Sequence, residues 1–121
     1  MATRQTRFWK LSEDFMQDAK VAMIEYTKTK NEEKLRQACE KGFGAFTQAL
    51  MHYKGRAVRH KEFGRVADEL FAKSKAHDIL RAHRDAESLH ASFYDRVLSP
   101  LEVEDALNQI EAGMKIIRSL R

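Results

Sequence analysis

Apolar residues recur along most of the chain at alternating spacings of three and four, with polar and charged residues between them. This spacing places the apolar side chains on one face of an α-helix, which repeats every ~3.6 residues. A long amphipathic helix is therefore expected at the start of the chain. Its apolar stripe is Phe8, Leu11, Phe15, Ala19, Ala22, Met23 and Tyr26.

A second long helix is expected after the polar break at residues 27–30. Asn31 can cap its N-terminus, and Glu32 and Glu33 suit the positive end of the helix dipole. Gly55 is placed to end this helix. Gly42 lies inside the helix and indicates close packing against another helix. The apolar stripe is Leu35, Ala38, Cys39, Gly42, Phe46, Leu50 and Tyr53.

The rest of the chain predicts one short helix and two further long ones. The short helix carries Phe63, Val66, Leu70 and Phe71, and Asp78 is expected to cap the helix that follows it. That helix carries Ile79, Ala82, Ala86, Leu89, Phe93 and Val97 on one face.

The last helix has the clearest start in the sequence. Ser99, Pro100 and Glu102 give an N-cap, a first-turn proline and a capping box. Its stripe is Val103, Leu107, Ile110, Met114, Ile117 and Leu120. Short connectors between the long helices predict an all-α fold: an antiparallel four-helix up-and-down bundle with one additional short helix, forming a single domain over residues 1–121.

Composition supports this fold class. The chain has 121 residues with five glycines and one proline, which leaves little material for the turns of an all-β fold. No run approaches the ~20 apolar residues that span a bilayer, and the N-terminus lacks an apolar export segment. We therefore expect a cytoplasmic protein with no membrane association. Cys39 is the only cysteine, so we expect a small buried side chain without a disulfide partner.

Charge permits a nucleic-acid partner without selecting one. The net charge of +4 and the pI near 9.3 suit RNA or a nucleotide, although proteins that bind neither often have a similar excess. Positive charge gathers around one connector, which either receives phosphates or is a solvated turn. The basic residues there are Lys54, Arg56, Arg59, Lys61 and Arg65.

Arg84 and His90 lie on the same predicted helix, where a guanidinium and an imidazole can cleave RNA without a metal. Their separation leaves them about 120° apart around the helix axis and about 9 Å apart along it. A second copy of the helix would make a shared phosphate site easier to assemble. In the alternative interpretation, Arg84 pairs with Glu87 or Ser88 on a solvated face and His90 is hydrogen-bonded at the edge of the core.

Glu87 and His90 also form a Glu-x-x-His pair, and His83 joins them on the same stripe. A di-metal bundle site needs a second such pair, and no other glutamate precedes a histidine by three residues. We therefore expect no metal and no other cofactor. Tyr94, one turn after His90, is a candidate for a polar role, whereas Trp9 and Phe93 fit the apolar stripes and are expected in the core.

Two segments resemble a known family. The stretch RQACEKGFGAF at residues 36–46 and the stretch AESLHASFY at residues 86–94 are similar to the archaeal PaREP family, a branch of the HEPN (higher eukaryotes and prokaryotes nucleotide-binding) superfamily. The resemblance implies a helical bundle, usually dimeric. Many HEPN domains are metal-independent endoribonucleases that use an arginine, a polar residue and a following histidine. Arg84, Asp85 and His90 match that pattern, while the PaREP branch has no settled activity.

The resemblance also bears on partners. HEPN toxins that pair with nucleotidyltransferase antitoxins tend to carry a tyrosine two residues after the histidine. Here that position is Ser92, and the tyrosine is Tyr94. This departure argues against regulation of the toxin-antitoxin type. From the resemblance as a whole we expect a homodimer with RNA or a nucleotide as ligand, and a nucleotidyltransferase-type protein stays a further candidate partner.

Two functions are compatible with these residues. In the first, a metal-independent endoribonuclease, His90 removes a proton from a ribose 2′-hydroxyl and Arg84 stabilises the phosphate charge, while Asp85 orients the site. Because only His90 is expected at this site in one chain, a dimer interface would supply the second histidine as the acid. The alternative is a non-catalytic module that binds a nucleotide, RNA or a protein partner.

Overall fold

The computed structural model describes residues 4–120, and every regular element in that range is helical. The all-α prediction is therefore confirmed for the described part of the chain, and the single short helix is present. The elements are α1 (Arg4–Thr29), α2 (Glu32–Lys54), the 3-10 turn η1 (His60–Glu62), α3 (Phe63–Ser74), α4 (His77–Asp95) and α5 (Pro100–Ser119).

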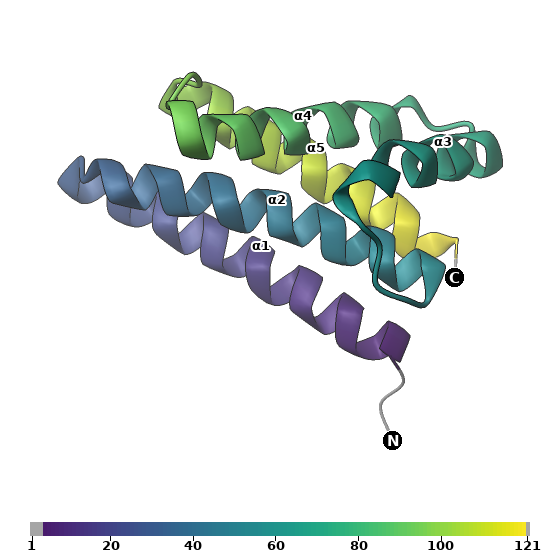
Figure 1. Ribbon diagram of the computed structural model, residues 1–121. Helices are drawn as coiled ribbons and strands as arrows, with labels where there is room; N and C mark the ends of the chain where they lie inside the picture. The colour runs from purple at the N-terminus through teal and green to yellow at the C-terminus, as the bar shows by residue number, and fades with distance from the viewer. Residues whose placement is uncertain (1–3, 121) are drawn as a thin grey trace.

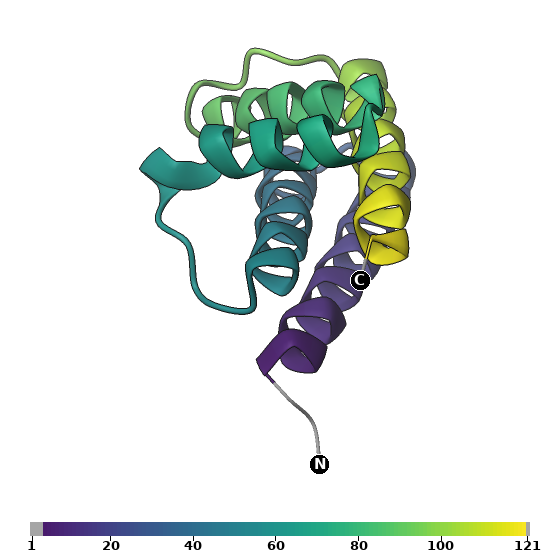
Figure 2. The same cartoon turned by 90° about the vertical axis from the view of Figure 1, so that its right-hand side faces the viewer.

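The helices form a bundle around α2. Helices α1 and α2 lie side by side as an antiparallel hairpin, and α4 and α5 form the layer above them (Figure 1). Helix α2 contacts α1, α4 and α5, whereas α3 packs mainly on α4. Seen from the end, α3 and α4 cover α2 from one side and α5 lies beside them (Figure 2). The segment between α2 and η1 therefore brings the chain back toward the α2–α4 contact.

Most predicted helix ends are confirmed by the hydrogen bonds that make them. The Asn31 side chain accepts a hydrogen bond from the Glu33 amide at 2.9 Å, and Gly55 ends α2 in the left-handed region with φ 74°. Ser99 and Glu102 form both hydrogen bonds of a capping box at the start of α5. These ends depend on neighbouring residues alone, which is why the sequence predicts them.

The predicted cap of α4 is wrong by two positions. Ala76 occupies the N-cap, without a side-chain hydrogen bond, and Asp78 lies inside the first turn. The Asp78 carboxylate instead accepts a hydrogen bond from Gln109 of α5 at 3.2 Å. The local pattern predicts that the Asp78 side chain caps the helix, but this side chain makes a tertiary hydrogen bond to α5 instead.

Glycines allow the close helix packing that the sequence indicated. A Cβ on Gly42 would lie 2.5 Å from Leu107 of α5 and 2.7 Å from Leu89 of α4. A Cβ on Gly113 would lie 2.7 Å from the Ala82 methyl. Since a real Cβ does not approach so closely, α2, α4 and α5 can meet at these points only because a hydrogen occupies each position.

The buried face of α1 is rotated from the predicted stripe. Leu11 is 42% exposed, while Ser12 and Met16 are buried. The Ser12 hydroxyl donates to the Ala45 carbonyl at 2.6 Å, which satisfies a polar group where α1 and α2 approach. Val97 was also placed on the core face and is 70% exposed, because α4 ends at Asp95.

The core is otherwise built from the predicted stripes. Cys39 is buried, as expected, and Trp9 and Phe93 are half-buried against the edge of the core rather than inside it. No helix within residues 4–120 is long and apolar enough to cross a membrane. The largest fully buried side chains include Phe46, Leu50, Leu70, Ile79, Leu89, Ile110 and Ile117.

Candidate functional site

His90 lies half-buried on α4 with an aromatic or imidazole ring on three sides. It stacks on Phe43 of α2 with ring centroids 4.3 Å apart and an interplanar angle of 22°. The ring of His60 stands against it at 5.1 Å and 76°, and that of Tyr94 at 5.4 Å and 89°. His90 is therefore held in one orientation by packing, with a second imidazole from the same chain beside it.

His60 is oriented by a carboxylate. Its Nε2 lies 2.8 Å and 3.0 Å from the two carboxylate oxygens of Glu87 on α4. An ionised carboxylate can only accept hydrogen bonds, so Nε2 of His60 must carry the donated proton. Nδ1 of His60 is then an acceptor in the neutral ring and a donor in the charged ring. This arrangement is typical of a histidine that exchanges protons.

The connector between α2 and α3 brings His60 to this place. Gly55 turns the chain after α2, and the η1 turn begins at His60. The next residue after the turn, Phe63, is buried and contacts the rings of His60 at 5.2 Å and Phe43 at 6.1 Å. Burial of Phe63 therefore fixes the turn that presents His60 to α4.

In the alternative interpretation, Glu87 is one of two candidate partners for Arg84, and it binds His60 instead. The expectation that one chain brings only one histidine to this site is wrong, because His60 contacts His90. Spacing gave no signal for His60, because its contact with α4 depends on the path of the whole connector. The one available indication was its place in the run Arg59-His60-Lys61, inside the basic connector.

Arg84 and His90 have different surroundings, although both belong to α4. Arg84 is exposed and makes no ion pair within residues 4–120. Burial raises the pKa of Asp85 above its ordinary value, the positive charge of Arg84 lowers it, and the negative charge of Asp105 raises it again. Arg84 thus interacts with Asp85, and Asp85 also experiences the charge of Asp105 on α5. Both residues lie about 120° or more around the helix from His90.

Tyr94 is 65% exposed and contacts the site edge-on. Its ring stands at 85° to Phe93 with centroids 5.0 Å apart, in addition to its contact with His90. Phe93 is covered in turn by the Arg36 guanidinium at 4.9 Å. The exposed tyrosine ring is therefore supported from below and open to solvent above.

The five predicted basic residues divide into two groups. Lys54 forms an ion pair with Glu69 at 3.1 Å, and Arg56 forms one with Glu62 at 3.4 Å. The other three are exposed and form no ion pair in the described part of the chain: Arg59, Lys61 and Arg65. Two of these three flank His60 in sequence, so the basic connector and the His90 site belong to one region.

The site does not resemble a metal centre. Among residues 4–120, no group of three histidine, cysteine, aspartate or glutamate side chains is arranged to hold a metal ion. His83 lies beside α3, where a Cβ on Gly64 would be 3.7 Å from its Nε2, and its Nδ1 is buried without a hydrogen-bond partner there. The residues at hand are instead suited to proton transfer: two imidazoles in contact, a carboxylate and nearby cations.

Comparison with known proteins gives a family. No curated protein and no solved structure matches the chain. The model of the archaeal PaREP1/PaREP8 family matches residues 15–114, a range that contains Phe43, His60, Glu87, His90 and Tyr94. The match runs from the first helix into the last and thus covers most of the bundle. The chain therefore belongs to the archaeal PaREP1/PaREP8 family.

Proposed function

We propose that this protein is a metal-independent endoribonuclease in which His60 and His90 exchange protons with the substrate. The observation that carries the proposal is the contact between the two imidazoles at 5.1 Å, with Glu87 fixing the tautomer of one of them. Cleavage of RNA needs a base for the 2′-hydroxyl and an acid for the leaving oxygen. Both groups are present in one chain.

The reaction is an internal transfer at phosphorus. Nδ1 of His60, left as an acceptor by the bond to Glu87, removes the proton of the ribose 2′-hydroxyl. The 2′-oxygen bonds to phosphorus as the bond to the 5′-oxygen breaks, and His90 protonates the leaving 5′-oxygen. The products are a 2′,3′-cyclic phosphate and a free 5′-hydroxyl. His90 is therefore the acid in this assignment, whereas the sequence predicts it as the base. General acid–base catalysis of this kind raises the rate by a factor of roughly 10²–10⁴.

The ring geometry limits where the phosphate lies. Rings with centroids 5.1 Å apart leave no room for a phosphate between them, so the substrate lies across their exposed edges. Arg59 and Lys61 flank His60 and can hold the negative charge there. An unpaired base can stack on the exposed ring of Tyr94. A single-stranded RNA segment fits this combination of groups.

A HEPN-like topology and a homodimer remain part of the proposal. Arg84 lies about 120° around α4 from His90, so a second copy of the helix would make it easier for the arginine and the histidine of the HEPN pattern to share one anion. A second copy packed along α4 would bring its own Arg84 toward this region. In that dimer Asp85 would restrain Arg84, with which it already interacts.

One observation favours the second candidate function, a non-catalytic module that binds a nucleotide, RNA or a protein. His90 makes three ring contacts, and such packing is what a purely structural histidine also needs. In that case the basic connector would bind the ligand and the two histidines would only maintain its shape.

Cleavage of a fluorogenic single-stranded RNA in the presence of EDTA distinguishes the two functions. We expect activity in the unaltered protein, and a loss of about 10²-fold or more in His60→Gln and in His90→Gln. His77→Gln is the matched control, because His77 is an exposed histidine at the start of the same helix. An oligonucleotide with a 2′-deoxy sugar at the cleaved position should not be cut.

Equal activity in all four proteins, or no activity at high protein concentration, would reject the ribonuclease. Thermal unfolding of each variant shows whether a loss comes from unfolding. RNA binding by fluorescence anisotropy then tests the module: binding without cleavage in the unaltered protein would favour it.

A further inference from the structure

A pocket of about 410 Å³ lies at the end of the bundle where α1 turns into α2 and α4 turns into α5. Figure 1 shows both turns at the same end of the molecule, away from the two termini. The volume falls in the range of about 300–1,000 Å³ that is typical of small-molecule sites. It is separate from the His60 and His90 rings, none of which lines it.

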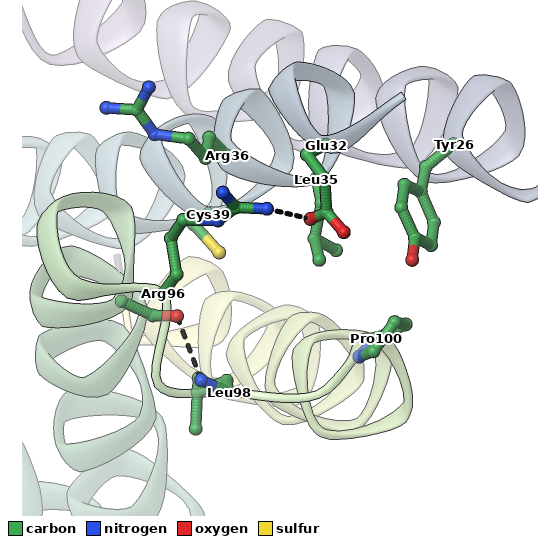
Figure 3. A pocket seen from close by; sticks show the side chains of 9 residues that line it. Tyr26, Glu32, Leu35, Arg36, Cys39, Arg96, Leu98 and Pro100 are labelled. Atoms are coloured by element: carbon green, nitrogen blue, oxygen red, sulfur yellow. Dashed lines mark hydrogen bonds and ion pairs between the residues drawn. The ribbon is translucent and has the colours of Figure 1, made fainter. Parts of the chain in front are cut away.

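The walls combine polar and charged groups with apolar surface. Leu35, Leu98 and Pro100 give apolar surface, and the Tyr26 hydroxyl and the Cys39 sulfur point into the space between α2 and α5 (Figure 3). Burial raises the pKa of the Cys39 thiol, so the thiol is neutral at neutral pH. The wall is thus mixed, with polar and charged groups beside a smaller apolar surface, which suits a small organic molecule that carries a charged head group.

Of the two arginines that line the pocket in the described part of the chain, Arg96 is the one whose guanidinium reaches into this space. Its guanidinium extends across the pocket to the Glu32 carboxylate, whereas that of Arg36 is turned away (Figure 3). Arg36 is held there by the Phe93 carbonyl and by Glu33. Anion recognition inside the pocket therefore depends on Arg96.

The backbone at Arg96 is unusual for an arginine. Arg96 has φ 55°, in the left-handed region, and its amide donates to the Ser92 carbonyl to end α4. Glycine or asparagine is the ordinary residue at such a position. The left-handed backbone conformation is unfavourable for an arginine, and it places the Arg96 guanidinium against Glu32.

The ion pair between Arg96 and Glu32 can be exchanged for a ligand. Both side chains are about half exposed. An ion pair with this exposure is weak, so a competing carboxylate or phosphate can displace the Glu32 carboxylate at little cost. The Glu32 carboxylate thus marks the position that a ligand anion would take.

We propose that this pocket binds a small organic anion, whose carboxylate or phosphate replaces Glu32 on Arg96 and whose apolar body lies against Leu35, Leu98 and Pro100. The size of the pocket suits a body of about one aromatic ring with its substituents. The proposal is independent of the ribonuclease, since it uses neither histidine.

Calorimetric titration of the full chain with phenyl phosphate, phenylacetate and inorganic phosphate tests the site. At least one of the two aromatic anions should bind with Kd of about 1 mM or tighter. Inorganic phosphate, which lacks the apolar body, should bind at least about tenfold more weakly. The stronger of the two aromatic anions tells whether phosphate or carboxylate is the preferred head group.

Variants at the two residues of the ion pair should change the affinity for the anion in opposite directions. Arg96→Asn should weaken binding about tenfold or more, and asparagine tolerates the left-handed backbone. Glu32→Gln removes the internal competitor and should tighten binding about two- to fivefold. Arg81→Gln, at an exposed arginine of α4 that does not line the pocket, is the matched control and should leave the affinity unchanged.

Three results would overturn the proposal. The first is no heat of binding for either aromatic anion up to about 10 mM, well beyond the expected Kd. The second is an equal loss in Arg81→Gln and Arg96→Asn, which would indicate unspecific charge attraction. The third is unchanged or weaker binding in a Glu32→Gln variant that circular dichroism shows to be folded.

Discussion

The rings of His60 and His90 contact each other with their centroids 5.1 Å apart, although His60 comes from the turn before α3 and His90 from the C-terminal half of α4. Glu87 lies one turn before His90 and makes a hydrogen bond with His60. Helix α4 therefore provides both the histidine that His60 contacts and the carboxylate that orients His60. The basic connector and α4, which are separate features in the sequence, therefore meet at one region of the surface.

Replacing Glu87 by glutamine should affect chemistry more than stability. Glutamine offers both a donor and an acceptor to Nε2 of His60, so the tautomer of His60 is no longer fixed. We expect kcat for RNA cleavage to fall about tenfold or more with KM unchanged. Both side chains are partly exposed, so the free energy of unfolding should change by less than about 1 kcal/mol.

Steady-state kinetics on the fluorogenic RNA and urea unfolding measure these two effects. Glu104→Gln is the control, because Glu104 is an exposed carboxylate on α5. A rise in KM with kcat unchanged would assign Glu87 to RNA binding instead of proton transfer.

Gly42→Ala should destabilise the bundle. The added methyl group would lie 2.5 Å from Leu107 and 2.7 Å from Leu89, so both buried leucines must move. Overpacking of this kind costs about 1–3 kcal/mol, which exceeds the gain of up to about 1 kcal/mol from alanine in a helix. Gly64→Ala is the contrast, since its methyl group would meet only His83 at 3.7 Å. We expect Gly64→Ala to be neutral or stabilising in urea unfolding, and a stable Gly42→Ala would show that the leucines repack freely.

The fold could be predicted wherever local chemistry decides it. Ser99 and Glu102 cap α5 through residues in their own turn, and the stripe from Val103 to Ile117 is buried as its spacing predicts. Prediction failed where a tertiary contact competes with local pattern. Gln109 takes the Asp78 carboxylate away from capping, and the Ser12 bond to the Ala45 carbonyl rotates the face of α1.

The candidate site was less predictable for a related reason. The sequence indicates His90 by its place on a helix, and its neighbour Tyr94 follows from helical periodicity. His60 was missed because its position depends on Gly55, on the η1 turn and on burial of Phe63, none of which has a fixed spacing to α4. Contacts made by an irregular connector carry no periodic signal.

Asp85→Asn should change stability in a pH-dependent way. Burial, the first cause, together with Asp105, raises the pKa of Asp85 in the folded protein despite the opposing charge of Arg84. The stabilisation from this group is therefore complete below the ordinary aspartate pKa of about 3.9, and is lost as pH rises through the raised folded value. At pH 7 the variant should be more stable than the unaltered protein by up to about 0.5 kcal/mol.

The difference should disappear as the pH falls toward about 3.5, where both proteins carry a neutral side chain. Urea unfolding across this range is the measurement, with Asp95→Asn as an exposed control. A variant that is less stable than the unaltered protein at pH 7 would contradict this prediction. It would show that the attraction between the Asp85 carboxylate and Arg84 outweighs the cost of burying the charge.

The salt dependence of RNA binding should separate the two groups of basic residues. Each phosphate contact with single-stranded RNA adds about 0.7 to the slope of log K against log salt, so Arg59→Gln and Lys61→Gln should each lower the slope by about that amount. Arg56→Gln should lower it less, because Glu62 already pairs with Arg56 at 3.4 Å. Fluorescence anisotropy over a potassium chloride series measures the slopes, with Lys28→Gln at the far end of α1 as control. If Lys28→Gln matches Arg59→Gln, RNA is attracted by net charge alone and the connector beside His60 is not its binding surface.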